Sequence, residues 1–222
     1  MDQISNIIKW LINFVLHMDK QLPIIVSSIG SYTYLALFAM IFIETGVVIL
    51  PFLPGDSVLF AAGAVAALEG SGLNPLILHV LLAVAAILGD TCNYWIGHSM
   101  GSRVFTTESR WLKKEYLDRT HVFYEKHGGK TIFLARFIPI IRTFAPFVAG
   151  VGEMTYAHFL SYNVIGGIVW TGLFIWAGYF FGSQPFIKNN FSLVIIAIIV
   201  ISLLPAVFEF LKTRSVKPSS AE

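Results

Sequence analysis

The stretch that decides the fold is Phe42-Ile-Glu44-Thr-Gly-Val-Val-Ile-Leu-Pro51-Phe-Leu-Pro54-Gly55-Asp56-Ser57, an apolar run with two acids and two prolines. A second apolar run, Phe133-Leu-Ala-Arg136-Phe-Ile-Pro139-Ile-Ile-Arg142-Thr-Phe-Ala-Pro146, is also broken by proline, but its charges are two arginines. We call these runs the acidic segment and the basic segment. Ionisable side chains at membrane depth are costly and normally face a partner or a cavity. Breaks in two halves of a membrane protein point to a binding site, so these segments are our candidate functional region.

The composition is typical of a helical membrane protein. Of the 222 residues, 56% are hydrophobic and only 13% are charged, whereas soluble domains carry about 25% charged residues. Residues 75–97, 155–181 and 191–211 are apolar runs of about the 20 residues that a membrane-spanning helix needs. We therefore predict an all-α polytopic membrane protein.

Several classes of function are not supported by the sequence. The sequence contains no nucleophile elbow, P-loop or Cys/His metal array. We expect no enzymatic activity, no cofactor, no metal and no nucleic-acid partner, and the oligomeric state is not specified by any motif. Cys92 is the only cysteine, so no disulfide can form within the chain, and we expect it to be a small buried packing residue.

The distribution of basic residues predicts the topology. No Lys or Arg occurs between Lys20 and Arg103, whereas the connector 101–130 and the tail 212–222 are rich in them. Basic residues next to spans favour the cytoplasmic side, so we expect the connector and the C-terminus to be cytoplasmic. Three apolar segments lie between them, 131–150, 155–181 and 191–211. Two ends on the same side require an even number of crossings, so one of the three segments cannot cross. We therefore predict that residues 131–150 enter and leave on one face as a re-entrant hairpin, which is tolerated where protein surrounds the broken backbone.

The same reasoning applied to the first half makes residues 33–68 a hairpin that dips in from the outside. Two hairpins from opposite faces, each followed by a spanning helix, form an inverted repeat. The alternative is a plain bundle of full-length spans. The residues predicted to break the hairpins are Pro51, Pro54, Gly55, Pro139 and Pro146.

The predicted organisation is one membrane domain over residues 1–222. An interfacial amphipathic helix and linker occupy 1–30, because apolar and polar residues alternate there at helical spacing; the alternative is a helix packed against the bundle. The remaining parts are a first hairpin plus span (31–100), a polar connector (101–130), a second hairpin plus span (131–185), a C-terminal span (190–211) and a basic tail (212–222).

The acids and arginines suggest complementary roles. Glu44 and Asp56 have no basic neighbours in sequence, and removal from water favours the neutral form of a carboxylic acid, so we predict that they handle protons. Arg136 and Arg142 present planar forks of donors suited to phosphate, and we predict that they bind a phosphate group. The alternative for all four is a set of structural ion pairs, or for Asp56 a helix N-cap.

Two further features complete the prediction. Asp90 follows Gly89 near the inner end of a span, with Asn93 and Tyr94 close by. Asp90 and Tyr94 are candidates for lining the same cavity, although Asp90 could equally be hydrated at an interface. Gly97-x-x-x-Gly101 and Gly178-x-x-x-Gly182 permit close approach of helices.

Taken together, the motifs resemble those of the bacterial DedA family, part of the DedA/VTT superfamily. The resemblance rests on Glu44-Thr-Gly, the run from Pro51 to Ser57, Gly89-Asp90, Tyr94, the run from His127 to Pro139, the run from Arg142 to Gly150, Met154, Phe159, Asn163, Gly166 and Trp170. It implies a multi-pass protein of the bacterial inner membrane that transports lipid carriers such as undecaprenyl phosphate and is linked to the proton-motive force. It also adds Asn163 to the candidates for lining the cavity.

We therefore expect a transporter or flippase of a phosphate-bearing lipid, most simply undecaprenyl phosphate, that is coupled to protons. Glu44 and Asp56 are expected to pair with the arginines when no lipid is bound. Three alternatives stay open: a non-selective phospholipid scramblase, a structural or regulatory protein of the cell envelope without transport activity, and a small-ion antiporter. An antiporter would use the acids but would not need the arginines.

Overall fold

The computed structural model describes residues 28–47, 55–104, 128–182, 184–191 and 193–198, together with Ile24, Val26, Val200, Ile201 and Leu204. All regular structure in these residues is helical, and no strand occurs in them, which confirms the predicted all-α class for this part of the chain. The helices are α3 (Tyr32–Gly46), α4 (Gly55–Ala66), α5 (Pro75–Val104), α7 (Pro139–Val151), α8 (Tyr156–Phe181) and α9 (Pro185–Asn189), and residues 128–135 form a further helical stretch before α7.

Several predicted features lie outside the described residues. These are the N-terminal amphipathic helix, Pro51 and Pro54, most of the connector and the basic tail. They stay predictions.

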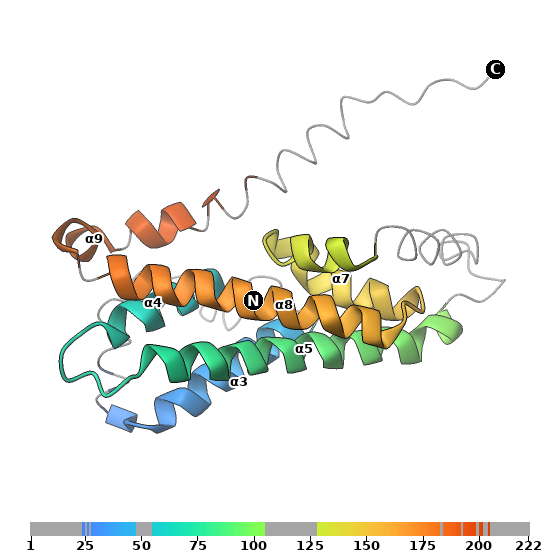
Figure 1. The fold of residues 1–222 in the computed structure, drawn as a ribbon, viewed down its shortest axis with the longest axis horizontal. Coiled ribbons are helices and arrows are strands. Elements are labelled where there is room, and N and C mark those ends of the chain that lie inside the picture. The colour runs from blue at the N-terminus through green and yellow to red at the C-terminus, as the bar shows by residue number, and fades with distance from the viewer. Residues whose placement is uncertain are drawn as a thin grey trace, which may run out of the picture.

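Two helices are long and apolar enough to cross a membrane: Pro75–Met100, within α5, and α8. They run side by side in opposite directions along the length of the molecule (Figure 1). Large apolar side chains at every fourth position of α5, namely Leu76, Val80, Val84 and Leu88, are exposed. Soluble proteins rarely expose such a continuous apolar stripe, so this face is suited to contact lipid.

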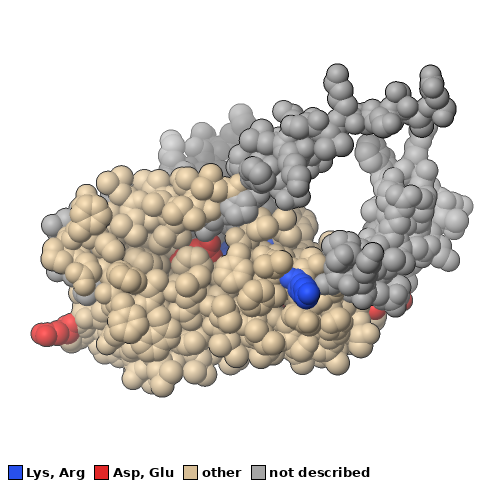
Figure 2. All heavy atoms as spheres, turned by 45° about the horizontal axis from the view of Figure 1, so that its top comes forward, with Lys and Arg blue, Asp and Glu red and all other residues tan. Residues whose placement is uncertain are grey.

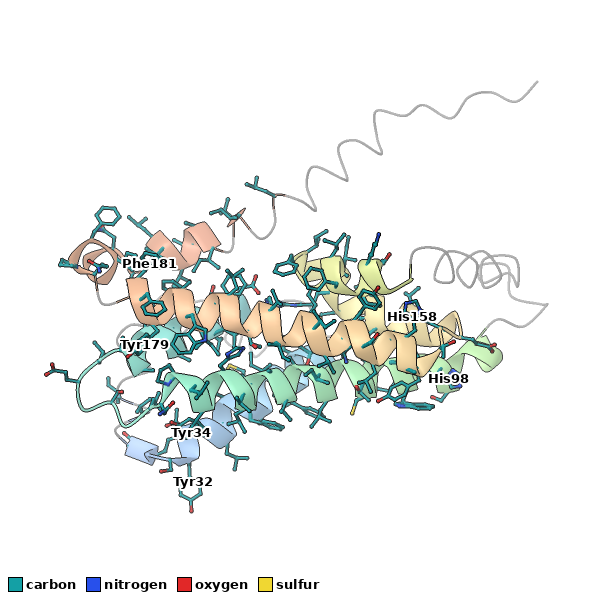
Figure 3. The ribbon with its side chains drawn as sticks, in the orientation of Figure 1. Tyr32, Tyr34, His98, His158, Tyr179 and Phe181 are labelled. Atoms are coloured by element: carbon teal, nitrogen blue, oxygen red, sulfur yellow. The ribbon has the colours of Figure 1, made fainter. Side chains whose placement is uncertain are left out.

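Aromatic and imidazole side chains gather at both ends of this helix pair. Figure 3 shows His98 and His158 at one end and Tyr34, Tyr179 and Phe181 at the other. At the first end Trp95 packs edge-on against His98, with ring centroids 5.4 Å apart. Trp and Tyr rings favour membrane–water interfaces, so the two clusters fit the two surfaces of a bilayer.

The remaining described helices are too short to span. α3 has 15 residues, α4 has 12 and α7 has 13, about 18–23 Å at 1.5 Å per residue, whereas the hydrocarbon core is about 30 Å thick. α3 ends at Gly46 and is followed by the extended residue Val47, α4 begins at Gly55, and Pro139 is the first residue of α7. Ile138 is extended, as expected before proline, so the helix over 128–135 cannot continue directly into α7.

The prediction that Pro146 breaks the helix was wrong. Pro146 lies inside α7, which continues to Val151. Proline removes one helical hydrogen bond, here the one to the carbonyl of Arg142, and crowds that turn. α7 packs along α5 at this point, and neighbouring helices can compensate for such a loss.

The short helices pack on the long helix of the opposite half of the chain: α4 lies on α8, and α7 lies on α5. Both crossings are backbone contacts that only glycine allows, because a Cβ atom at any of four glycines would collide with a facing carbonyl group. The contacts are Gly63 with Ile175 and Gly178 with Phe60 at one crossing, and Gly150 with Tyr94 and Gly97 with Phe147 at the other. The two crossings therefore share one pattern, in which each helix offers a carbonyl and, three residues later, a glycine. Gly97 and Gly178 thus serve the close approach predicted for them.

Cys92 is exposed on α5, and the expectation that it is buried was wrong. Cysteine is usually buried in soluble proteins because it is a small apolar residue. On a lipid-facing helix an apolar side chain gains nothing by turning inward.

We expect Gly63→Ala to lower the thermal stability of the purified protein in detergent. The added methyl group must push α4 away from the backbone of α8, and overpacking of this kind costs about 1–3 kcal/mol. Gly150→Ala should have a similar effect, since its crossing is built in the same way. The measurement is the midpoint of thermal unfolding, with Ser99→Ala on the exposed face of α5 as the control. Unchanged midpoints for both glycine variants would contradict this account of the crossings.

Candidate functional site

Five charged side chains are buried in the described part of the bundle: Glu44, Asp56, Asp90, Arg136 and Arg142. They come from five separate segments, α3, α4, α5, the turn before α7, and α7. Figure 2 shows acidic and basic atoms side by side in a hollow of a face that is otherwise almost uncharged. Three carboxylates and two guanidinium groups carry a formal charge of −1 when all are ionised.

Arg142 binds two acids at once. Its Nη1 donates to Oδ1 of Asp56 at 2.8 Å, and its Nη2 donates to Oε1 of Glu44. Glu44 lies in the last turn of α3 and Asp56 in the first turn of α4. A single guanidinium group from α7 therefore joins the two helix ends of the acidic segment.

Glu44 also caps α4. Its Oε1 accepts a hydrogen bond from the backbone N–H of Gly55 at 3.1 Å, one of the N–H groups that have no partner within a helix at its N-terminus. A Cβ atom on Gly55 would collide with this carboxylate, which explains glycine at this position. Asp56, in the first turn of α4, also benefits from the positive end of the helix dipole.

Trp170 of α8 completes this group, which we call the Arg142 cluster (Glu44, Asp56, Arg142 and Trp170). Its indole N–H donates to Oδ1 of Asp56 at 2.8 Å. The guanidinium carbon of Arg142 lies 4.8 Å from the centroid of the Trp170 ring, within the range of a cation–π interaction. No sequence motif marked Trp170 as a partner of charged residues.

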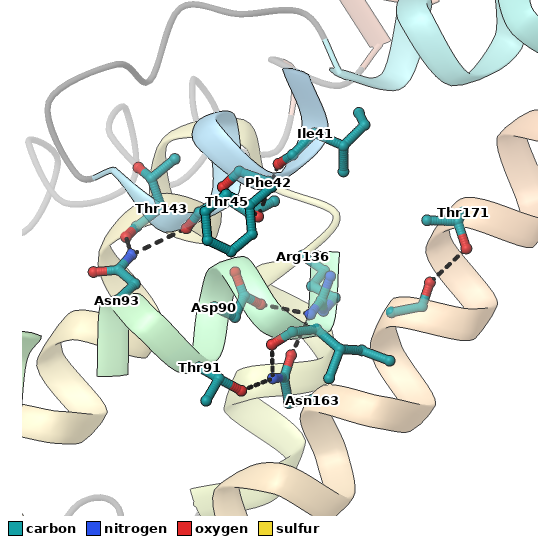
Figure 4. Close-up of polar contacts among 12 residues, drawn as sticks. Ile41, Phe42, Thr45, Asp90, Thr91, Asn93, Arg136, Thr143, Asn163 and Thr171 are labelled. Atoms are coloured by element: carbon teal, nitrogen blue, oxygen red, sulfur yellow. Dashed lines mark hydrogen bonds and ion pairs between the residues drawn. The ribbon is translucent and has the colours of Figure 1, made fainter. Parts of the chain in front are cut away.

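Arg136 belongs to a second group, the Arg136 cluster (Asp90, Arg136 and Asn163). Nη2 of Arg136 donates to Oδ2 of Asp90 at 2.5 Å and to Oδ1 of Asn163 (Figure 4). The amide of Asn163 donates in turn to the carbonyl of Ile87 at 3.1 Å, which fixes its orientation. The two spans α5 and α8 thus each supply one ligand for Arg136.

Asn93 connects α5 to both broken segments. Its amide nitrogen donates to the carbonyl of Thr143 in α7 at 2.7 Å and to the carbonyl of Thr45 in α3 at 3.3 Å (Figure 4). Thr45 lies in the last turn of α3, where backbone carbonyls have no helical partner. Thr143 lies in the first half of α7. Asn93 therefore joins α5 to the end of α3 and to α7 through backbone carbonyls.

Both clusters lie well inside the long helices. Asp90 is 15 residues from Pro75 and 14 from Val104, about 21–23 Å from either end at 1.5 Å per residue. Trp170 is 14 residues from Tyr156 and 11 from Phe181, about 21 and 17 Å from the ends. α5 continues past Gly97 to Val104, so Asp90 does not lie near the end of this helix.

Several polar atoms of the site are buried without a hydrogen-bond partner among the described residues. They are Oε2 of Glu44, Oδ1 of Asp90, Nε and Nη1 of Arg136 and Nε of Arg142. An unpaired buried polar group costs about 1–3 kcal/mol, and more when it is charged. The described residues therefore leave capacity for further hydrogen bonds at this site.

The structure brings most of the predicted residues together, but with a different pairing. Arg142 pairs with Glu44 and Asp56, whereas Arg136 pairs with Asp90 and Asn163. Tyr94 is buried, and its hydroxyl donates to the carbonyl of Met154. Its ring stacks on Phe159 with centroids 4.6 Å apart, so Tyr94 contributes to packing at the start of α8 rather than to either cluster.

Comparison with known proteins identifies the class. The model of the VTT domain matches residues 53–180, which include α4, α5, α7 and all of α8 except its last residue. Protein DedA of Escherichia coli K12 is 51% identical over 218 residues, covering 98% of this chain and 100% of that protein. An uncharacterised membrane protein of Mycobacterium tuberculosis is 44% identical over 80% of this chain and 78% of its own length. The inner membrane protein YqjA of E. coli K12 is 34% identical over 72% and 73%. No solved structure matches the chain.

The fold and these similarities define a helical membrane protein with a VTT domain. The chain belongs to the DedA family.

We expect Arg142→Gln to destabilise the protein by about 3–5 kcal/mol, because it leaves two buried carboxylates without their counter-ion. Glu44→Gln should cost less, since Arg142 keeps Asp56. Thermal unfolding in detergent measures both effects. Lys130→Gln, which removes an exposed positive charge, is the matched control, and equal stability of all three variants would contradict the cluster.

Trp170→Phe keeps an aromatic face for Arg142 but removes the N–H donated to Asp56. Hydrogen bonds to charged groups contribute about 1.5–3 kcal/mol, so the variant should unfold at a lower temperature than the wild type. Trp170→Leu, which also removes the ring, should be less stable again. A Phe variant as stable as the wild type would show that the bond to Asp56 has no net value.

Proposed function

We propose that this protein moves a phosphate-bearing lipid, most simply undecaprenyl phosphate, between the leaflets of the bacterial inner membrane, and that protons accompany the movement. The phosphate is bound by the guanidinium groups of Arg136 and Arg142, and the acids exchange protons. The identity of the lipid is taken from the family resemblance. The phosphate group is supported by the side chains of the site.

The observation that carries the proposal is the charge balance of the buried site. Three carboxylates face two guanidinium groups among apolar helices, giving a formal charge of −1. A phosphate group adds further negative charge, and uncompensated charge is very costly away from water. Each negative charge that enters must therefore be matched by a proton on one of the acids. This requirement would couple lipid binding to protons through Glu44, Asp56 and Asp90.

The arrangement of the helices supports a path for such a lipid. We infer that α3 and α4 are the arms of one re-entrant hairpin and that residues 128–135 and α7 are the arms of a second, which enters from the opposite face. The end of α3 and the starts of α4 and α7 lie beside the buried charges, so a head group could reach the site while its tail stays beside the exposed apolar faces of α5 and α8. In this arrangement the connector and the C-terminus are cytoplasmic.

The proposal is tested by reconstitution in liposomes with labelled undecaprenyl phosphate beside labelled phosphatidylethanolamine, with and without a pH gradient. Selective movement of the polyprenyl phosphate that accelerates with the gradient is the expected result. Equal movement of both lipids would indicate a non-selective scramblase. No movement of either would indicate a structural or regulatory role.

Glu44→Gln should reduce the effect of the pH gradient on transport. Glutamine cannot gain or lose a proton, so a step that depends on protonation of Glu44 no longer responds to pH. Lys130→Gln is again the control and should transport as the wild type does. A Glu44→Gln variant whose rate still follows the gradient as strongly as the wild type would exclude Glu44 from coupling.

A further inference from the structure

We infer that the two buried arginines have different tasks: Arg136 is the docking group for the phosphate, held ready by the positioning residues Asp90 and Asn163, whereas Arg142 is a latch that binds the acidic segment. This inference rests on the proposed function and divides its site into two parts. Four observations on the two clusters carry it.

The first observation is that both terminal nitrogens of Arg142 already donate to carboxylates. Nη1 and Nη2 each donate to a carboxylate, and the face of the guanidinium group lies on Trp170. Only Nε has no partner among the described residues. An anion that approaches these donors meets the carboxylates of Glu44 and Asp56, which also accept hydrogen bonds from Gly55 and Trp170.

The second observation is that Arg136 keeps donors free. Asp90 and Asn163 both bind the same nitrogen, Nη2, while Nη1 and Nε are buried without a partner in the described part of the chain. The side chain runs along α8, where a Cβ atom on Gly166 would lie 2.9 Å from Cδ and 3.1 Å from Nε. Nε therefore faces the helix backbone, and the two N–H groups of Nη1 are the donors left for an anion.

The third observation is the local charge. Arg136 faces one acid, Asp90, so this cluster is formally neutral; Arg142 faces Glu44 and Asp56, so that cluster carries −1. No other charged side chain of the described residues is buried beside them. An incoming phosphate is repelled less by a neutral cluster than by one with a net charge of −1.

The fourth observation explains asparagine at position 163. Its oxygen shares Nη2 of Arg136 with Asp90, and its nitrogen is bound to the carbonyl of Ile87. A neutral amide thus orients Arg136 without adding negative charge. An aspartate of the same shape would keep an acceptor for Arg136 but would give this cluster the charge of the Arg142 cluster.

The experiment measures binding by the purified full-length protein in detergent. The probes are farnesyl phosphate, farnesol and inorganic phosphate. Their binding is measured by isothermal titration calorimetry at several pH values. The wild type should bind farnesyl phosphate and bind farnesol at least tenfold more weakly. Competition by inorganic phosphate at millimolar concentration would show that the phosphate group alone is recognised, and an absence of competition would show that the tail is also needed; the docking group is Arg136 in both cases.

The variants separate the two arginines. Asn163→Asp and Arg136→Lys should each weaken binding of farnesyl phosphate at least tenfold, while Arg142→Lys should weaken it less and instead change its dependence on pH. Asn163→Ala, which frees Arg136 without adding charge, should have a smaller effect than Asn163→Asp. Lys130→Gln is the control. Thermal unfolding of every variant identifies any that fail to fold. If the other variants fail to fold, the affinity of Asn163→Ala is compared with that of the wild type.

Two results would overturn the inference. One is an equal loss of affinity in Arg136→Lys and Arg142→Lys, and the other is wild-type affinity in both Asn163 variants. The experiments distinguish a failure of this inference from a failure of the proposed function. Selective binding that the variants weaken as expected, without movement of lipid in liposomes, would support the docking role of Arg136 and contradict transport. Movement of lipid together with binding that is unaffected by the Asn163 and Arg136 variants would support transport and contradict the docking role.

Discussion

The interaction on which the described structure depends is the bond of one guanidinium group, Arg142, to carboxylates from two different helices. Glu44 ends α3 and Asp56 begins α4, and α3 and α4 are not packed extensively on α7. Apolar contact between helices gives little net association when lipid is equally apolar. Charges buried in one place therefore fix the positions of three short segments more strictly than their apolar faces can.

The glycine crossings also fix the positions of the short helices, through backbone contact rather than charge. They let α4 lie against α8 and α7 against α5 at backbone contact, so that each broken segment is supported by the span of the other half. This exchange places Asp56 beside Trp170 and brings the basic segment to Asp90. The two clusters are thus products of packing between halves and could not form within either half alone.

The sequence predicted those parts of the site whose signal is local. Glu44, Asp56, Arg136 and Arg142 are conspicuous because each is a charge within an apolar run, and Pro139 marks its break by its effect on the preceding residue. The pairing could not be predicted, because Asp90 and Arg136 are 46 positions apart and Asp56 and Trp170 are 114 apart. Sequence reasoning ended the helix of Asp90 too early and so gave this residue too little weight. It gave Pro146 too much weight, because the packing of α7 on α5 cannot be read from the sequence.

The single cysteine gives the native chain a built-in reporter. Cys92 is exposed on α5 only two residues from Asp90, about 3 Å along the helix axis. A fluorophore attached there, quenched by lipids that carry nitroxides at chosen depths, would read the level of the buried charges within the bilayer. No residue would have to be replaced, so the depth of the buried charges in the bilayer could be measured in the wild-type protein.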